Sequence, residues 1–264
     1  MRYAAVLMFS LGLPAQAEQI TASRLDALPV ADVIILGETH DNPHHHAGQA
    51  RAIAGLRPAA LVWEMLTGTQ ALRMPERRVD AGLVAEALGW EGSGWPDFSL
   101  YFPLVQAAGA ARHYGAAVPR AEARRAFAEG AAAAFVGDAV AFGLAAPLRP
   151  EDQAAREAEQ FDAHCGAMPM DMMRGMVEAQ RLRDAELARV ALLALRETGG
   201  PVVVIAGSGH ARRDQGIPAA LASAAPTVGV LSLAFLEAQP VAPLWDLWLV
   251  TPPAEREDPC ASLQ

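Results

Sequence analysis

The chain has 264 residues and a formal net charge of −9, which argues against nucleic-acid binding because the basic surface that phosphates require is missing. Hydrophobic residues make up 52% of the chain, so a substantial core is available and extensive disorder is excluded. No stretch has the length and apolar character of a membrane span. We therefore expect one large folded domain, with or without a subdomain.

The first 17 residues have the pattern of a secretory signal peptide. Arg2 supplies a positive start, Ala4 to Leu13 form an apolar run, and Ala15-Gln16-Ala17 is a small-x-small cleavage site. No cysteine directly follows this site, so we expect no lipid anchor there. The pattern predicts an exported protein, periplasmic or secreted, whose mature domain is residues 18–264.

The chain has two cysteines, Cys165 and Cys260. In an oxidising compartment an even number of cysteines favours a disulfide, which would join the C-terminal tail to the middle of the chain. Two free buried thiols are the alternative. Neither cysteine belongs to a CxxC or CxxCH motif, so thioredoxin-like chemistry and covalent haem attachment are disfavoured.

Strand and helix patterns alternate at both ends of the chain, around a helical middle. Four branched apolar residues from Val33 to Leu36 are typical of a strand buried on both faces, and Asn42-Pro43 is a helix-start signal. Further strands are predicted at 59–65, 116–119, 202–205, 228–233 and 244–250. Helices are predicted at 44–56, 68–88, 99–113, 121–146 with interruptions near Gly130 and Gly137, 151–196 with a gap at 164–169, and from about 217. This alternation predicts an α/β fold, a mostly parallel β-sheet flanked by helices. A smaller helical subdomain is expected from residues 66–100 and 150–180.

Three of the predicted strands end in polar side chains. Glu38 and His40 follow the first strand, Glu64 ends the second, and His210 follows the strand at 202–205. Because the carboxyl ends of parallel strands meet at one edge of a sheet, the four side chains are expected to converge there. Such a group can carry out general acid–base catalysis, or hold a divalent metal through His40 and His210. Alternatively, each side chain caps a helix or bonds a backbone amide.

The run His44-His45-His46 lies on the first turn of a predicted helix. Its three side chains point in different directions, so they cannot all serve one site. A protonated imidazole is also disfavoured at a helix N-terminus by the helix dipole. We expect exposed side chains here, with one at most facing the crevice.

Methionines are concentrated in one segment, which holds Met168, Met170, Met172, Met173 and Met176. Their flexible, polarizable side chains suit the walls of an apolar ligand pocket. The alternative is that they belong to the ordinary core.

The sequence lacks the motifs of several enzyme classes. It has no HExxH, GxSxG, GxxxxGK[ST] or GxGxxG pattern. A conventional zinc protease, serine hydrolase, nucleotide hydrolase or dinucleotide-dependent enzyme therefore has no support.

Several segments together resemble the ChaN-like haem-binding uptake proteins. They are 36–42 (LGETHDN) with the histidines that follow, 61–65 (LVWEM), Trp95 with 101–104 (YFPL), Gln180 with Arg183-Asp184, and 205–210 (IAGSGH). The resemblance implies a parallel α/β domain with a smaller helical domain, in an exported bacterial protein of haem or iron uptake. It implies non-covalent haem binding, with a homodimer and haem-transport machinery as the partners to expect.

The same Glu/His signature resembles the wider group of erythromycin esterases, Tiki and TraB proteins. In that group paired GExH and GxxH motifs are interpreted as catalytic or metal-binding, and here the motifs are Gly37–His40 and Gly207–His210. The resemblance keeps open a hydrolase, metal-assisted or not, that uses Glu38 as general base. We favour a haem-binding protein over an enzyme.

A haem site needs an apolar slot, an axial ligand to the iron and positive groups near the propionates. Tyr101 lies closest to the Trp95 segment and is the first choice for the iron ligand, with His164 the second. Tyr101 can equally be a packed core residue. The residues expected to contact haem are Tyr101, His164, Met172, Met173, Arg174 and Arg183.

Overall fold

A computed structural model describes residues 17–258, 260 and 261. The predicted signal peptide lies outside the described residues, apart from its last residue, Ala17. Among the described residues, no helix combines the length and the apolar character needed to cross a membrane.

Within the described part of the chain, seven strands form one sheet in the order β1-β7-β6-β2-β5-β3-β4, and every pairing is parallel. The strands are β1 (Glu18–Gln19), β2 (Val33–Glu38), β3 (Ala60–Trp63), β4 (Arg112–Gly115), β5 (Val202–Gly207), β6 (Val230–Leu236) and β7 (Leu247–Val250). The predicted parallel α/β fold is confirmed. Its central strand, β2, pairs with β5 on one side and β6 on the other, so its carboxyl end lies in the middle of the sheet edge.

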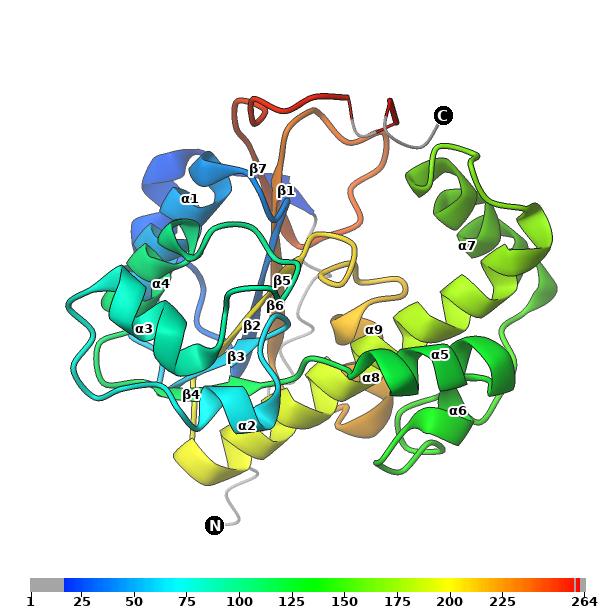
Figure 1. Cartoon of the computed structure of the whole chain (residues 1–264), viewed down its shortest axis with the longest axis horizontal. Coiled ribbons are helices and arrows are strands. Elements are labelled where there is room, and N and C mark those ends of the chain that lie inside the picture. Colours follow the sequence, from blue (N-terminus) through cyan, green and yellow to red (C-terminus); the bar gives the residue numbers. More distant parts are fainter. Residues whose placement is uncertain (1–16, 259, 262–264) are drawn as a thin grey trace, which may run out of the picture.

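Helices cover both faces of the sheet (Figure 1). The α-helices are α1 (Pro43–Leu56), α2 (Gly68–Ala71), α3 (Ala81–Leu88), α4 (Phe102–Ala107), α5 (Arg120–Glu129), α6 (Ala131–Ala134), α7 (Pro150–Ala163), α8 (Met173–Thr198) and α9 (Ile217–Ala224). Three 3₁₀ helices accompany them: η1 (Ala22–Ala27), η2 (Phe98–Leu100) and η3 (Met170–Met172).

The apolar run of β2 follows from its burial on both faces. Ile34 and Leu36 pack into a core with residues of α1 and α4, while Val33 and Ile35 pack into a second core with α8 and α9. Successive side chains of a strand point to opposite faces, so a strand between two helical layers needs apolar residues at every position.

The start of α1 lies where the sequence predicts it. The Asn42 side chain accepts hydrogen bonds from the backbone N–H groups of His44 and His45, and Pro43 is the first helical residue. This cap fixes the direction of the chain immediately after the Glu38–Asp41 turn. The expectation that the histidine run is exposed is wrong for His45 and His46, both of which are buried.

Two predicted elements differ from the structure between the second and fourth strands. The helix predicted at 68–88 is two short helices, α2 and α3, because Pro75 lies between them and cannot continue a helix. The strand predicted at 116–119 is β4, four residues earlier, and the preceding helix is shorter because Gly109 turns the chain at a φ of +55°.

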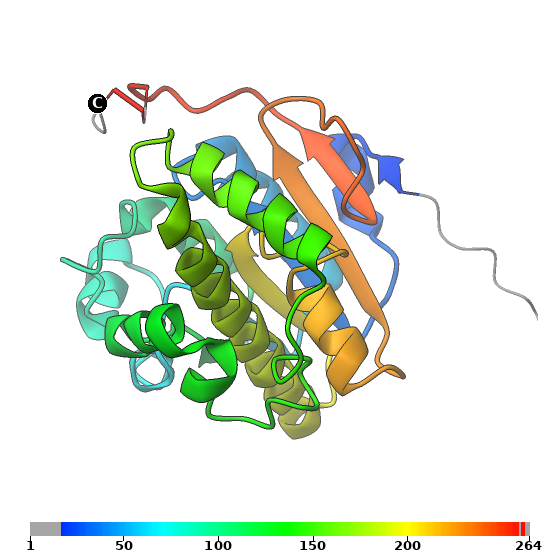
Figure 2. The ribbon, with the colours of Figure 1, turned by 90° about the vertical axis from the view of Figure 1, so that its right-hand side faces the viewer.

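The helices α5 to α8 form a lobe beside the sheet (Figure 2). Its small core is mainly alanine, and it is continuous with α8, whose C-terminal half packs under the sheet. The segment 66–100 instead contributes side chains such as Leu66, Val84 and Leu88 to the core on the other face of the sheet. The limits of the helical subdomain at 66–100 and 150–180 stay a prediction.

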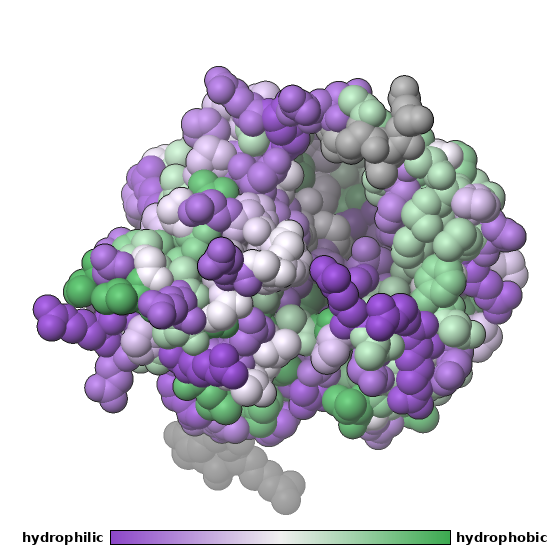
Figure 3. All heavy atoms as spheres, viewed as in Figure 1, coloured by the Kyte–Doolittle hydropathy of each residue, from purple (hydrophilic) through white to green (hydrophobic). Residues whose placement is uncertain are grey.

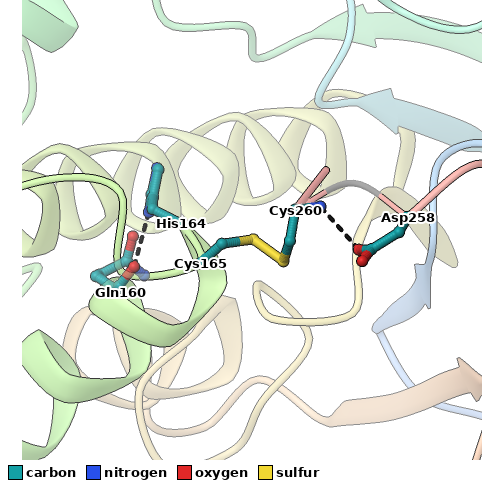
Figure 4. The surroundings of a disulfide bond; sticks show 5 residues. All are labelled: Gln160, His164, Cys165, Asp258 and Cys260. Atoms are coloured by element: carbon teal, nitrogen blue, oxygen red, sulfur yellow. Dashed lines mark hydrogen bonds between the residues drawn. A yellow bond between two sulfur atoms is a disulfide. The ribbon is translucent and has the colours of Figure 1, made fainter. Parts of the chain in front are cut away.

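The C-terminal segment runs from β7 to the end of α7, where Cys260 forms a disulfide with Cys165 (Figures 1 and 4). The expected pairing of the two cysteines is therefore present. It joins two points 95 residues apart in the sequence.

Candidate functional site

The structure brings together the four polar residues that were expected to meet at the sheet edge. Nδ1 of His40 lies 3.0 Å from Glu38 Oε1, and its Nε2 lies 3.8 Å from Glu64 Oε2. On the other side of Glu64, Nε2 of His210 lies 3.5 Å from Oε1. Carboxylates and imidazoles thus alternate along the ends of β2, β3 and β5.

Two further residues extend this row, and the sequence analysis missed both. His46 places Nδ1 2.9 Å from Glu38 Oε2, and Asp184 places Oδ1 2.6 Å from His210 Nδ1. We call the six residues the edge network; they are Glu38, His40, His46, Glu64, Asp184 and His210. The helical spacing of both residues indicates that they face inward. His46 shares a helix face with buried Gln49 and Ile53. Asp184 lies four residues after Gln180, on the same helix face.

Burial and mutual charge set the protonation of the network. Burial on its own would raise the pKa of Glu38, but hydrogen bonds from His40 and His46 outweigh it and lower that pKa. Burial likewise opposes charge on His210, yet the neighbouring carboxylates of Glu64 and Asp184 raise its pKa to about 10. The charge of His210 in turn lowers the pKa of Glu64 to about 2, against the effect of burial. These shifts favour ion pairs around Glu38, Glu64 and His210, whereas burial raises the pKa of Asp184.

A cavity of about 920 Å³ opens over this edge, between the sheet and the α5–α8 lobe, and Figure 3 shows a hollow on this face. Its volume lies within the range of roughly 300 to 1,000 Å³ that is typical of small-molecule sites. Its walls include network residues together with apolar and cationic side chains, among them Met65, Trp95, Val118, Arg120, Met176, Arg183 and Leu187.

His164, which follows α7, also lines this cavity. Its Nδ1 lies 2.7 Å from the carbonyl oxygen of Gln160, and Figure 4 shows both residues beside the disulfide. A carbonyl can only accept a hydrogen bond, so Nδ1 carries the proton and the lone pair of a neutral ring is on Nε2. Among the described residues, His164 is the cavity histidine whose ring has no carboxylate partner.

Tyr101 lies behind the cavity wall and is fully buried. Its hydroxyl donates to the carbonyl oxygen of His40, at 3.3 Å, and its ring packs edge-on against His46. Burial and the nearby charge of Glu38 raise the pKa of Tyr101 far above its ordinary value. A tyrosinate is therefore disfavoured at this position. The assignment of Tyr101 as iron ligand stays a prediction, but its placement favours a role in holding His40.

The other expected haem contacts are divided between regions. Arg183 lines the main cavity. Met172 and Arg174 line a separate cavity of about 620 Å³ between α5 and α8, and Met173 is fully buried in the core. Met176, one turn further along α8, is the methionine of this cluster that reaches the main cavity.

The edge network does not have the arrangement of a metal site. Its imidazole nitrogens are directed at carboxylates or at carbonyl oxygens. Over residues 17–258, 260 and 261, no group of three or more His, Cys, Asp or Glu side chains is placed to hold a metal ion. A divalent metal on His40 and His210 has no support from this geometry.

The fold and the cavity define a parallel α/β protein with a ligand site at the carboxyl edge of its sheet. Residues 24–221 match the model of a family described as "Haem-binding uptake, Tiki superfamily, ChaN". The match covers most of the chain, and the chain belongs to this family. The resemblance found in the sequence is thereby confirmed.

One solved structure, described as cofacial heme binding to ChaN of Campylobacter jejuni, aligns with a TM-score of 0.65. It is 19% identical, over 82% of this chain and 86% of that chain, which shows a shared fold. An erythromycin esterase mutant, EreC in its open conformation, gives a TM-score of 0.40 at 13% identity, over 81% of this chain and 74% of that chain. The type III effector HopBA1 gives 0.41 at 11% identity, over 84% and 88%. These two likenesses are too weak to carry an argument. No curated protein matches the sequence.

Proposed function

We propose that this protein is exported and binds haem non-covalently in the 920 Å³ cavity, as part of haem or iron uptake. The observation that carries the proposal is the placement of His164 in that cavity, with Nδ1 bonded to a backbone carbonyl. Membership of the haem-binding uptake family supports the choice of ligand.

His164 is the residue that we propose to bind the iron. A metal-binding histidine commonly donates its second ring N–H to a carbonyl or carboxylate, which fixes the ring and leaves the other nitrogen for the metal. His164 makes that bond to Gln160. His40 and His210 are hydrogen-bonded to carboxylates that raise their pKa values, which favours the protonated ring over one with a lone pair to offer.

The remaining walls suit an apolar macrocycle with two carboxylate arms. Trp95, Met176 and Leu187 supply apolar and polarizable surface. Arg120 and Arg183 supply two guanidinium groups, and neither is in an ion pair with the described acidic residues. In a chain of net charge −9, two cations left available at one cavity favour an anionic ligand.

A haemin titration of the mature protein, followed by absorbance in the Soret band, tests this proposal. We expect a saturable shift that His164→Ala weakens on the order of 100-fold, since even outer partners of metal ligands contribute up to that factor. His44→Ala, which changes an exposed histidine of α1, is the matched control and should bind like the native chain.

Two outcomes would change the proposal. No saturable shift in the native chain would overturn haem binding. Binding that Tyr101→Phe weakens and His164→Ala does not would return the iron ligand to Tyr101.

Export and partners extend the proposal. A disulfide is typical of oxidising compartments, which supports a periplasmic or secreted location. The relative from Campylobacter jejuni is described as binding heme cofacially, and we propose that a homodimer and haem-transport machinery are the partners of this chain. Export predicts that the mature protein begins at Glu18, which N-terminal sequencing of the secreted fraction checks.

Hydrolysis is a second candidate function, favoured by one observation. His40, a member of the edge network, is 30% exposed at the cavity and hydrogen-bonded to the buried carboxylate of Glu38. Such a pair can transfer protons. An esterase and peptidase screen tests it: activity lost in Glu38→Gln would support a hydrolase, and no turnover in the native chain would exclude the substrates screened.

A further inference from the structure

The C-terminal residues 251–258 and Cys260 join the two sides of the cavity, and we call them the strap. One end is fixed to the sheet: the N–H of Thr251 donates to the carbonyl of Leu236, and Asn42 donates to the carbonyl of Pro252. The other end is the disulfide between Cys260 and Cys165. In Figure 1 the strap passes along the edge of the molecule from β7 toward α7.

Two attachments of the strap each lie one residue away from a cavity residue. Arg256 donates to both carboxylate oxygens of Asp41, at 2.7 Å each, and Asp41 directly follows His40. Cys165 directly follows His164. The strap therefore links the backbone beside His40 to the backbone beside His164.

The sheet end of the strap is strongly held. Arg256 also donates to Glu237, at 2.6 and 2.8 Å, and these bonds lower the pKa of Glu237 to about 2. Glu237 accepts further bonds from Asn42 and from the N–H of Ala254. Bidentate Arg–carboxylate pairs with several shared hydrogen bonds are the strong class of ion pair.

The helix at the other end is weakly held by its own packing. None of the residues of α7 is fully buried. Its described polar ties are to the loop after β5, where Arg212 and Gln215 both donate to Glu159. These contacts lie on the second-last turn, and the disulfide is the tie at the end of the helix, where His164 lies. A segment with little burial samples other positions easily unless it is tethered.

We propose that the strap is a positioning element of the cavity: through Cys165–Cys260 it holds His164 in the place from which it binds the haem iron. This inference rests on the proposed function. Without the disulfide, the His164 imidazole can still bind iron, but it occupies the binding position for a smaller share of the time. If that share falls to about a tenth, the apparent dissociation constant for haem rises about tenfold.

A double-mutant cycle separates positioning from a general loss of stability. Haemin affinity is measured for the native chain, His164→Ala, Cys165→Ser/Cys260→Ser, and the combination of all three changes. Positioning through His164 predicts that His164→Ala has a much smaller effect once the disulfide is absent. It also predicts that the disulfide variant needs about tenfold more haemin to reach the absorbance signature of histidine-ligated ferric haem.

Other outcomes are distinguishable. If the native chain binds haemin through His164, and the cysteine variant has the same affinity and spectrum or the two effects simply add, the strap inference is wrong and the proposed function stands. If the native chain does not bind haemin, both are overturned.

Two further measurements test the positioning role of the strap even if the cysteine variant folds poorly. Arg256→Gln leaves the disulfide intact and loosens the sheet end of the strap, so it should weaken haemin binding in the same direction by a smaller factor. Hydrogen exchange without haemin should be faster at residues 160–168 in either variant than in the native chain. Unchanged exchange there and unchanged affinity in Arg256→Gln would contradict a positioning role.

Discussion

Two histidines line the same cavity from opposite sides, and their partners give them opposite chemistry. At the sheet edge, His210 lies between Glu64 and Asp184, whose charges raise its pKa to about 10. At the end of α7, Nδ1 of His164 is bonded to the carbonyl of Gln160. A carboxylate partner stabilises an imidazolium, whereas a carbonyl partner fixes the tautomer of a neutral ring so that its lone pair is on the other nitrogen.

The two regions also differ in how they are held. Four residues of the edge network, Glu38, His46, Glu64 and Asp184, are buried, and Glu38 ends β2, which pairs with a strand on each side. The end of α7 has little burial of its own and is joined to the body by a disulfide.

The largest effect is expected at the edge network, from Glu64→Gln. This change removes the carboxylate between His40 and His210 and leaves both imidazoles without their shared partner. We expect a loss of about 3 kcal/mol in the free energy of unfolding, since breaking a buried ion pair leaves an uncompensated charge. Thermal unfolding measures it, with the exposed Glu151→Gln as control. An equal melting temperature for both variants would contradict the ionic network.

The pH dependence of the free energy of unfolding tests the charges of the edge network, and the expected effect is smaller than that of Glu64→Gln. Because the pKa of His210 rises from 6.5 to about 10 on folding, its contribution is complete below pH 6.5 and is lost as the pH rises toward 10. Because the pKa of Glu64 falls from 4.5 to about 2, its contribution is complete above pH 4.5 and is lost as the pH falls toward 2. The network should therefore stabilise the fold most between pH 4.5 and 6.5.

Melting temperatures measured from pH 5 to pH 9 check this dependence. We expect a decline above pH 6.5 in the native chain and a flatter profile in Glu64→Gln, where His210 has lost one of its two carboxylates. A native profile that rises over this range would contradict the assigned charges.

The smallest effect on haemin binding is expected when a cationic side chain of the main cavity is removed. Arg183→Gln should weaken haemin binding by roughly 1 kcal/mol, or about fivefold, because a partly exposed ion pair to a propionate contributes no more than that. Arg174→Gln is the matched control, since Arg174 lies on the same helix but lines the separate 620 Å³ cavity. Equal losses in the two variants would mean that Arg183 does not meet a propionate.

The sheet and its edge were predictable because the signals are local. Apolar runs such as Val33–Leu36 and Val202–Ile205 are typical of doubly covered strands, and parallel strands must bring their polar ends together. The cap at Asn42 was equally readable. The helix dipole at the start of α1 favours exposed histidines, but His46 is buried because the Glu38 carboxylate and the His40 carbonyl lie against its ring.

The cavity wall was harder to predict because it joins segments that are distant in sequence. Asp184 meets His210 only through the crossing of α8 past the end of β5, and Met172 and Met176 face different cavities although one helical turn separates them. Tyr101 is close to Trp95 in sequence, yet packing buries its hydroxyl against the backbone of His40. Side-chain direction at such positions depends on tertiary packing rather than on local pattern.

The most direct test of the contrast between the two histidines is the ferric haem spectrum of His164→Gly, recorded with and without added imidazole. We expect the variant to lose the histidine-ligated signature of the native complex and to regain it when imidazole fills the vacated position. A His164→Gly spectrum identical to that of the native complex, with no response to imidazole, would show that the iron is bound elsewhere and would contradict the assignment of His164.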